Sequence, residues 1–367
     1  MVAKKKEAKE AGDERSAEKI QEEADLQELL EQKKARIKVI GAGGAGNNTA
    51  TRLLESGVAK VDVVAVNTDA QQLLYCKADK KILIGKVLTR GLGAGADSQI
   101  GEEAAKESRE EIKKSLTGAD MIFITCGLGG GTGTGAAPII AETAKKLGAL
   151  TVGIITMPFT MEGRHRMNNA YGGLSKLEKH VDTLIIIPND KLLEIVPEVS
   201  ITTAFKIADE ILVNAVRGIT DLVMQPGLVN LDFADVKAVM SDGGLAMIGL
   251  GSSDTENRAM EAVERALNNP LLDVDVEGAK GALINISGGT NITIRECQEI
   301  VERVSSVLDP NAKIIWGAVV DKTLGEGVNT LIIVTGVNAL DEFGEKEAIK
   351  ETKKKEMENV LGVDVVG

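Results

Sequence analysis

A glycine-rich run between Gly127 and Gly135 constrains the fold of this chain more than any other feature. Six of its nine residues are glycine, and it lies between a strand-like segment, Met121–Thr125, and a helical one, Thr134–Leu147. So much glycine is conformationally costly unless backbone N–H groups must approach a large anion. A helix that begins at such a loop adds unpaired N–H groups and its dipole. The run therefore predicts a phosphate-binding loop, with hydroxyl donors at Thr132 and Thr134. The alternative, a flexible hinge, needs neither the strand nor the helix.

Two further glycine-rich segments precede helical stretches. Gly41–Asn47 fits the GxGxxG pattern, a weak signal that alone favours a dinucleotide site. That alternative requires an acidic residue at the end of the second strand to bind the ribose, and Asn67 stands there instead. Gly91–Asp97 is placed to close over the distal phosphate. Because neither Gly41–Asn47 nor Gly127–Gly135 ends in Gly-Lys-Ser/Thr, backbone dipoles and Mg²⁺ must balance the phosphate charge.

Strand-like and helical segments alternate from Ile37 to Ile187, which predicts a Rossmann-like α/β fold with a doubly wound, mostly parallel sheet. The helical run Ile201–Asp221 has apolar residues on most sides, so it should be buried between two bodies. A smaller α/β unit follows it. The expected helices include Asn47–Ser56, Gln99–Leu116, Thr134–Leu147, Asn168–His180, Glu256–Asn268 and Ile294–Leu308.

Five parts are expected along the chain. They are a charged N-terminal extension (1–35), a nucleotide-binding domain (36–200), a central helix (201–222), a second α/β domain (223–336) and a charged linker with a C-terminal tail (337–367).

Charge and cysteine content exclude several classes of function. The net charge of −12 argues against binding to nucleic acid and to an anionic membrane surface, both of which favour basic proteins. No apolar run is long enough to cross a bilayer, so direct membrane insertion is not expected. The three cysteines are odd in number and far apart, which excludes a full disulfide framework and shows no metal-binding spacing. These features predict a cytoplasmic protein in a reducing compartment.

The three glycine loops, in this order and with the core Gly-Gly-Gly-Thr-Gly-Thr-Gly, resemble those of the tubulin/FtsZ family. The resemblance extends through Asn67-Thr68-Asp69, Met157-Pro158-Phe159, Glu162-Gly163, Arg166 and the segment Asn230–Val236, and covers roughly residues 36–336. So many ordered motifs are very unlikely to arise by chance. The compact second domain and short acidic tail resemble the prokaryotic cell-division branch of the family more than eukaryotic tubulins.

This resemblance implies a site for GTP or GDP with Mg²⁺. Gly43, Gly44 and Asn48 would lie beside the α- and β-phosphates, and Ala94 and Gly95 would approach the γ-phosphate. Gly130, Gly131, Thr132 and Gly133 would cradle the phosphates. Glu162 and Arg166 would contact the ribose and nearby polar groups, and Asn189, Phe205 and Asp209 would form the base pocket.

The chemistry of Asp209 favours guanine. An ionised carboxylate can accept hydrogen bonds from guanine N1–H and N2–H₂ together, whereas adenine has no donors at those two positions. Phe205 precedes Asp209 by about one helical turn and can stack on the base. The alternatives are core packing for Phe205 and a solvent-facing helix position for Asp209.

Asn230, Asp232 and Asp235 are the expected catalytic residues. Asp232 and Asp235 are three residues apart, so both carboxylates can share one face at a helix start, although Asp232 alone could equally be an N-cap. Asp209 and Asp221 are separated by about 18 Å of helix, which places these aspartates far from the nucleotide of their own subunit. We therefore expect hydrolysis in trans, with the carboxylates orienting a water for the next subunit's γ-phosphate in a head-to-tail homopolymer. The resemblance implies the same arrangement, at the division site.

Two questions remain open from the sequence. A protein that holds GTP without turnover is an alternative, and the presence of all three catalytic candidates argues against it. The apolar ending Val360–Val366 follows a charged linker, which suggests a peptide that docks on a partner. Relatives in the family use such tails to bind membrane anchors, and a fraying terminus is the alternative.

Overall fold

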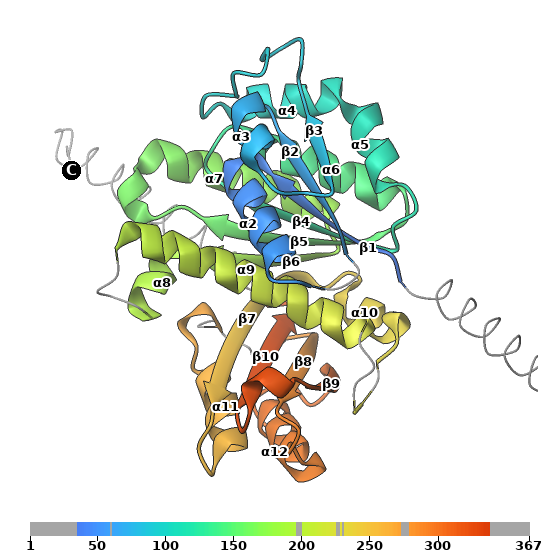
Figure 1. The fold of residues 1–367 in the computed structure, drawn as a ribbon, viewed down its shortest axis with the longest axis vertical. Coiled ribbons are helices and arrows are strands. Elements are labelled where there is room, and N and C mark those ends of the chain that lie inside the picture. The colour runs from blue at the N-terminus through green and yellow to red at the C-terminus, as the bar shows by residue number, and fades with distance from the viewer. Residues whose placement is uncertain are drawn as a thin grey trace, which may run out of the picture. The chain divides into compact units, whose positions relative to one another are not determined.

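A computed structural model describes residues 35–58, 61–195, 200–224, 228–229, 231–272 and 279–337. The predicted N-terminal extension before Ala35 and the predicted tail after Val337 lie outside the described residues. The described residues from Ile37 to Val337 form one compact unit, whose elements are shown in Figure 1.

Ten strands form one sheet in the order β3-β2-β1-β4-β5-β6-β7-β10-β8-β9. The strands β1 to β6 are all parallel, β7 is parallel to β6, and β10 is antiparallel to both β7 and β8. Their bounds are β1 (Ile37–Ala42), β2 (Val61–Asn67), β3 (Lys80–Leu83), β4 (Met121–Gly127), β5 (Leu150–Met157), β6 (Thr183–Pro188), β7 (Gly244–Ser253), β8 (Gly281–Gly288), β9 (Lys313–Val320) and β10 (Val328–Thr335). The predicted α/β fold and its parallel sheet are confirmed.

The helices of the described residues connect these strands (Figure 1). They are α2 (Gly43–Glu55), α3 (Ala70–Tyr75), α4 (Ser98–Glu107), α5 (Arg109–Leu116), α6 (Thr132–Lys146), α7 (Arg164–Leu177), α8 (Asn189–Ile195), α9 (Ile201–Met224), α10 (Phe233–Met240), α11 (Arg258–Leu267) and α12 (Ile294–Ser305). Short 3₁₀ turns lie at Thr160–Glu162, Glu178–His180, Pro270–Leu272 and Lys322–Leu324.

The core lies on both faces of the sheet. In β4, Ile122 and Ile124 pack into one apolar cluster, and Met121 and Phe123 pack into the other. A strand covered on both faces has no solvent side, which explains its continuous apolar run. The cluster that contains Phe123 also holds most of the apolar residues of α9, together with residues from β1 and from β10. The prediction that this helix is buried is therefore confirmed, and Figure 1 shows α9 between the strands β1–β6 and the strands β7–β10, which belong to one continuous sheet.

Some helix predictions were wrong. The helix expected over Gln99–Leu116 is two helices, α4 and α5, which meet at Ser108. Ser108 leaves the helical conformation, with φ −99° and ψ 16°, and its hydroxyl accepts a hydrogen bond from the backbone N–H of Gly85. The helix expected from Asn47 begins at Gly43, so most of the first glycine loop is its first turn.

Candidate functional site

The order β3-β2-β1-β4-β5-β6 reverses direction between β1 and β4. Ligands of open α/β sheets bind at such a point, outside the carboxyl ends of the strands. Two of the predicted glycine loops follow β1 and β4, so both lie at this reversal.

A cavity of about 630 Å³ lies there, a size typical of small-molecule sites. Every residue that the family resemblance assigns to the nucleotide lines it: Gly43, Gly44, Asn48, Ala94, Gly95, Gly130, Gly131, Thr132, Gly133, Glu162, Arg166, Asn189, Phe205 and Asp209. The structure thus brings together residues that are far apart in the sequence.

The glycine loop after β4 forms one end of the cavity. Helix α6 begins at Thr132, so its first N–H groups and the positive end of its dipole face the loop. A side chain on Gly43, whose φ is +71°, would meet the backbone nitrogen of Gly133 at 2.7 Å. A side chain on Gly130 would meet no atom within 4 Å. The backbones of the two loops are therefore in close contact, whereas Gly130 faces open space of the kind an anion would fill.

The two threonines of this loop have different environments. Thr132 lines the cavity, and its hydroxyl is 2.6 Å from the hydroxyl of Thr68. Thr134 is buried behind the loop, where its hydroxyl accepts a hydrogen bond from the N–H of Gly129 at 2.9 Å. The prediction that Thr134 donates to a phosphate was therefore wrong, because that side chain braces the loop from behind.

The glycine loop Gly91–Asp97 lies against the glycine loop Gly127–Gly135. Ala94 and Gly95 line the cavity, and the following Asp97 accepts hydrogen bonds from two N–H groups at the start of α4. A side chain on Gly101 of α4 would lie 2.3 Å from the carbonyl oxygen of Gly131. Helix α4 therefore packs directly on the phosphate-binding loop.

Glu162 and Arg166 form an ion pair, with Glu162 Oε2 3.0 Å from Arg166 Nε. The Glu162 carboxylate also accepts a hydrogen bond from the N–H of Phe159. The pair therefore fixes the turn that leads into α7 and presents both polar groups to the cavity.

Phe159 and two residues of α9 shape the far end of the cavity. Phe205 is 42% exposed, although it belongs to a largely buried helix, so it is not a core residue. Its ring meets the buried ring of Phe159 edge to face, with centroids 5.4 Å apart. This contact fixes the Phe205 ring and leaves a face free toward the cavity. Asn189 is buried there, and its Oδ1 has no hydrogen-bond partner among the described residues.

Asp209 has partners that the sequence analysis did not identify. Its Oδ2 is 3.1 Å from Nε of Arg52, and its Oδ1 is 3.2 Å from the hydroxyl of Thr49, both on α2. Its side chain is 13% exposed, so a solvent-facing position is excluded. Burial raises the pKa of the Asp209 carboxyl, and Arg52 and the Thr49 hydrogen bond oppose that rise. The one-turn spacing of Thr49 and Arg52 was visible in the sequence, but which helix they face depends on the fold.

The predicted catalytic carboxylates do not line this cavity. Asp232 and Asp235 are exposed and form a reciprocal cap at the start of α10. The N–H of Asp235 donates to Asp232 Oδ1 at 2.9 Å, and the N–H of Asp232 donates to Asp235 Oδ2 at 3.3 Å. Asn230 lies outside the described residues. Figure 1 shows α10 beside the C-terminal end of α9, whereas Phe205 and Asp209 belong to its N-terminal part.

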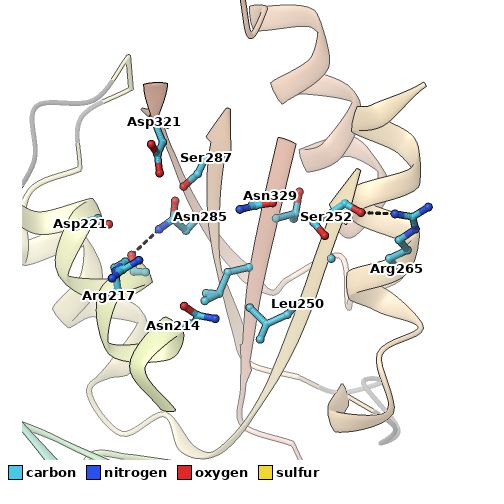
Figure 2. Close-up of a pocket in the computed structure, with 14 residues that line it drawn as sticks. Asn214, Arg217, Asp221, Leu250, Ser252, Arg265, Asn285, Ser287, Asp321 and Asn329 are labelled. Carbon is cyan, nitrogen blue, oxygen red and sulfur yellow. Dashed lines mark hydrogen bonds between the residues drawn. The ribbon is translucent and has the colours of Figure 1, made fainter. Parts of the chain in front are cut away.

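A second cavity, of about 420 Å³, lies between α9 and the strands β7, β8 and β10 (Figure 2). At its wall the Asn285 side chain donates a hydrogen bond to the carbonyl oxygen of Gly218 in α9. No residue predicted to bind the nucleotide lines this cavity. It also lacks a glycine loop at a helix start, so it is a poorer site for a phosphate group.

Two other kinds of site find no support. Burial raises the pKa of the Cys126 thiol to about 12, which makes this residue a poor nucleophile. Among the described residues there is no group of three or more His, Cys, Asp or Glu side chains that could hold a metal ion. Within the same residues, none of the helices has the length and apolar character to span a membrane.

Two family models match the chain. One, described as the GTPase domain of the tubulin/FtsZ family, matches residues 36–197, and one described as the C-terminal domain of the FtsZ family matches residues 244–338. The cell division protein FtsZ 1 of Methanocaldococcus jannaschii is 61% identical over 322 residues, which are 88% of this chain and 88% of that protein. FtsZ 1 of Thermococcus kodakarensis is 59% identical over 323 residues, or 88% of this chain and 86% of that protein.

Solved structures of other proteins are also similar to this chain. An empty FtsZ dimer from M. jannaschii matches with a TM-score of 0.83 at 61% identity, covering 86% of this chain and 92% of that chain. CetZ2 from Haloferax volcanii, solved as a GTPγS-bound protofilament, matches with a TM-score of 0.75 at 23% identity, covering 87% of this chain and 99% of that chain. The second likeness shows a shared fold.

Proposed function

The chain belongs to the tubulin/FtsZ family of GTPases, in its FtsZ branch, and we propose that it assembles head to tail and completes GTP hydrolysis at the contact between two subunits. The observation that carries this proposal is the separation of two half-sites. The nucleotide cavity and the acidic cap of α10 belong to the same chain, yet they lie at different ends of α9.

Guanine recognition is assigned to the end of the cavity formed by Asn189, Phe205 and Asp209. The carboxylate of Asp209 accepts from guanine N1–H and N2–H₂, and the exposed ring of Phe205 stacks on the base. Asn189 Oδ1 is buried and has no hydrogen-bond partner within the described part of the chain, so a ligand that donates a hydrogen bond there would satisfy it.

Phosphate binding is assigned to the glycine loops. The N–H groups of Gly130 to Gly133 and the start of α6 supply the positive end of aligned dipoles, with Gly43, Gly44 and Asn48 lining the cavity beside them. Asp69 is a carboxylate in the lining, but its side chain caps α3. This donor set fits a Mg²⁺ ion held mainly by phosphate oxygens and water, as Mg²⁺ is in many nucleotide sites. Bound in this way, the ion would neutralise phosphate charge.

The acidic pair cannot serve the cavity of its own subunit. Asp209 and Met224 are 15 residues apart in α9, which corresponds to about 22 Å of helix, and Asp232 follows farther along the chain. A second subunit stacked head to tail would bring its Asp232 and Asp235 to the open side of the cavity. There the two carboxylates, with Asn230, would orient a water molecule for attack on the γ-phosphate.

Exposed apolar side chains support such a contact at both ends. Leu92 is 86% exposed at the cavity rim, and Met161, next to Glu162, is 73% exposed. On the α10 side, Leu228 is 59% exposed close to the catalytic segment. A contact between two different surfaces of the same protein does not close on itself, so repetition produces a filament.

The expected site of action is the cytoplasm at the place of cell division, in keeping with the names of the relatives. The partner expected for the tail after Val337 is a membrane anchor or another division protein. Cell imaging of the full chain and of a chain ending at Val337 tests this expectation. If both localise alike, the tail has no anchoring role.

The test of the trans mechanism is Asp235→Ala, measured by phosphate release and by light scattering with GTP. We expect the variant to bind GTP normally and to hydrolyse it at least about a hundredfold more slowly, the size of loss typical for a positioning group of a catalytic water. In the unmodified protein, turnover per subunit should rise with protein concentration. Normal turnover in the variant, or turnover independent of concentration, would refute the mechanism.

A further inference from the structure

We propose that Thr49 and Arg52 of α2 are positioning residues that hold the Asp209 carboxylate in the orientation that selects guanine. The proposal rests on the assignment of Asp209 to the base, made above. It adds that the selectivity of this carboxylate is imposed from a second helix, by two residues that do not themselves line the nucleotide cavity.

The first argument is geometric. Each oxygen of Asp209 has one partner on α2, Arg52 for Oδ2 at 3.1 Å and Thr49 for Oδ1 at 3.2 Å. A carboxylate has about four acceptor positions, so two contacts leave the remaining positions for two donors of a base. Because the two contacts fix both oxygens, the plane of the carboxylate is fixed as well.

The direction of approach is the second argument. Asp209 lines the nucleotide cavity, whereas Arg52 lines a neighbouring cavity and Thr49 is buried, and neither of these two residues belongs to the lining of the nucleotide cavity. Arg52 also donates to the carbonyl oxygen of Lys206 at 3.4 Å, which ties its guanidinium to α9. The positive charge therefore contacts the carboxylate from outside the nucleotide cavity and does not occupy the place of the base.

The third argument is electrostatic. Burial and the charge of Glu210 raise the pKa of the Asp209 carboxyl, and Arg52 and the Thr49 hydrogen bond lower it. The other charged groups nearby are Lys206 on α9 and the Glu162–Arg166 pair, which faces the same cavity but is paired with itself. Arg52 is the cation in contact with the carboxylate, so it opposes the rise of the Asp209 pKa and favours the ionised form.

Thr49 also distinguishes the two protonation states. Its hydroxyl lies 3.2 Å from the carbonyl oxygen of Ala45 as well as from Asp209, and it has a single hydrogen to donate. An ionised carboxylate is the stronger acceptor and takes that hydrogen. A protonated Asp209 would instead donate to Thr49, and its carboxyl would lose the acceptor that guanine N1–H or N2–H₂ requires.

The experiment measures dissociation constants for GTP and for inosine triphosphate, which lacks the 2-amino group, from pH 5.5 to 8. The variants are Arg52→Gln, Arg52→Lys and Thr49→Val. Arg217→Gln is the matched control, because Arg217 also joins α9 to the end of α2, by donating to the Ser56 carbonyl oxygen, but does not contact Asp209. Asp209→Ala tests the base assignment itself, and thermal unfolding shows that each variant is folded.

We expect Arg52→Gln to weaken GTP binding about tenfold or more at pH 7, the usual size of a lost charge-assisted hydrogen bond. Binding needs the ionised carboxylate, so affinity is full above the pKa of Asp209 and is lost as pH falls through it. Removing Arg52 raises that pKa, so the loss should begin at a higher pH than in the unmodified protein. Arg52→Lys should restore most of the pH profile, and Thr49→Val should reduce the preference for GTP over inosine triphosphate.

The outcomes separate the two claims. If Asp209→Ala binds GTP normally, the base assignment is wrong. Two results would overturn the proposal while leaving the base assignment intact, provided that Asp209→Ala loses GTP binding. In the first, Arg52→Gln behaves like the control Arg217→Gln. In the second, Arg52→Gln loses affinity for GTP without a change in pH profile or in base preference, so that Arg52 has only a structural role.

Discussion

Gly130 and Gly135 lie five residues apart around the same loop but are glycines for different reasons. A side chain on Gly135 would lie 2.1 Å from the carbonyl oxygen of Ser98 and 2.4 Å from the nitrogen of Glu102, so α6 and α4 could not pack as they do. A side chain on Gly130 would meet nothing within 4 Å. Gly135 is therefore required by the packing of the protein itself, whereas Gly130 leaves space for what enters the cavity.

Alanine substitution should therefore separate stability from binding. Gly135→Ala should lower the free energy of unfolding by about 1–3 kcal/mol or more, because backbone atoms cannot yield to the new methyl group. Gly130→Ala should leave it unchanged or raise it by up to about 1 kcal/mol, since the unfolded chain loses freedom. Yet Gly130→Ala should bind GTP much more weakly. Denaturant unfolding and nucleotide titration measure both effects, and tight GTP binding by Gly130→Ala would contradict the placement of the phosphates.

Single residues were predictable where their chemistry depends on local sequence. The glycine loops and the pair Phe205 and Asp209 could be located because strand–loop–helix order and one-turn spacing are local properties. Thr134 was assigned wrongly because a loop sequence does not show which hydroxyl faces inward. Thr49 and Arg52 were missed because their partner is 160 and 157 residues away, a distance that only packing of α2 on α9 closes.

At the scale of elements, the cap of α10 is compatible with both roles that the sequence left as alternatives. Asp232 is an N-cap, and it remains available for catalysis, because Asp232 and Asp235 are exposed beyond the helix start. The reciprocal hydrogen bonds hold both carboxylates in fixed positions. Preorganised side chains of this kind suit the positioning of a water molecule.

The two roles can be separated by substitution of Asp232. Asp232→Ala removes the cap and should cost about 1 kcal/mol of stability, whereas Asp232→Ser keeps a hydroxyl acceptor for the N–H of Asp235 and should cost little. Both variants lose the carboxylate, so both should hydrolyse GTP slowly. Thermal unfolding together with phosphate release tests this. Normal turnover in Asp232→Ser would assign Asp232 to the cap alone.

Elements were predictable wherever periodicity alone determines them. The strand-like segment expected over Met121–Thr125 is β4, which was located because a buried parallel strand has a continuous apolar run. The junction between α4 and α5 at Ser108 was not predicted, because the two helices together have a continuous helical pattern. The break depends on contacts with the Gly85 turn. The short helices α3 and α8, of six and seven residues, are too brief for a reliable periodic signal.

At the scale of the whole molecule, α9 is the part that connects both half-sites. It contributes Phe205 and Asp209 to the nucleotide cavity, and its other end leads to the segment that holds Asp232. Its apolar residues pack in one cluster with strands from both ends of the sheet. In the proposed mechanism a rigid helix of this length fixes the distance between the half-sites, so that a second subunit is needed to bring them together.

A mixture of two inactive variants tests this division of labour. Asp209→Ala removes guanine binding but keeps the acidic pair, and Asp235→Ala keeps the nucleotide cavity but removes a catalytic carboxylate. In an equal mixture, about a quarter of the contacts would join an intact cavity to an intact acidic pair, if subunits pair at random in head-to-tail order. Phosphate release should therefore recover to roughly a quarter of the unmodified rate at the same total concentration.

Each variant measured alone, at that total concentration, is the control and should release little phosphate. The recovered activity should also rise steeply with concentration, because it needs a contact between two different chains. If hydrolysis took place within one subunit, mixing would restore nothing, since every chain lacks one of the two required groups. Catalysis between subunits would therefore be refuted if the activity of the mixture equalled the average of the two variants measured alone. A concentration-dependent excess over that average would require catalysis between subunits.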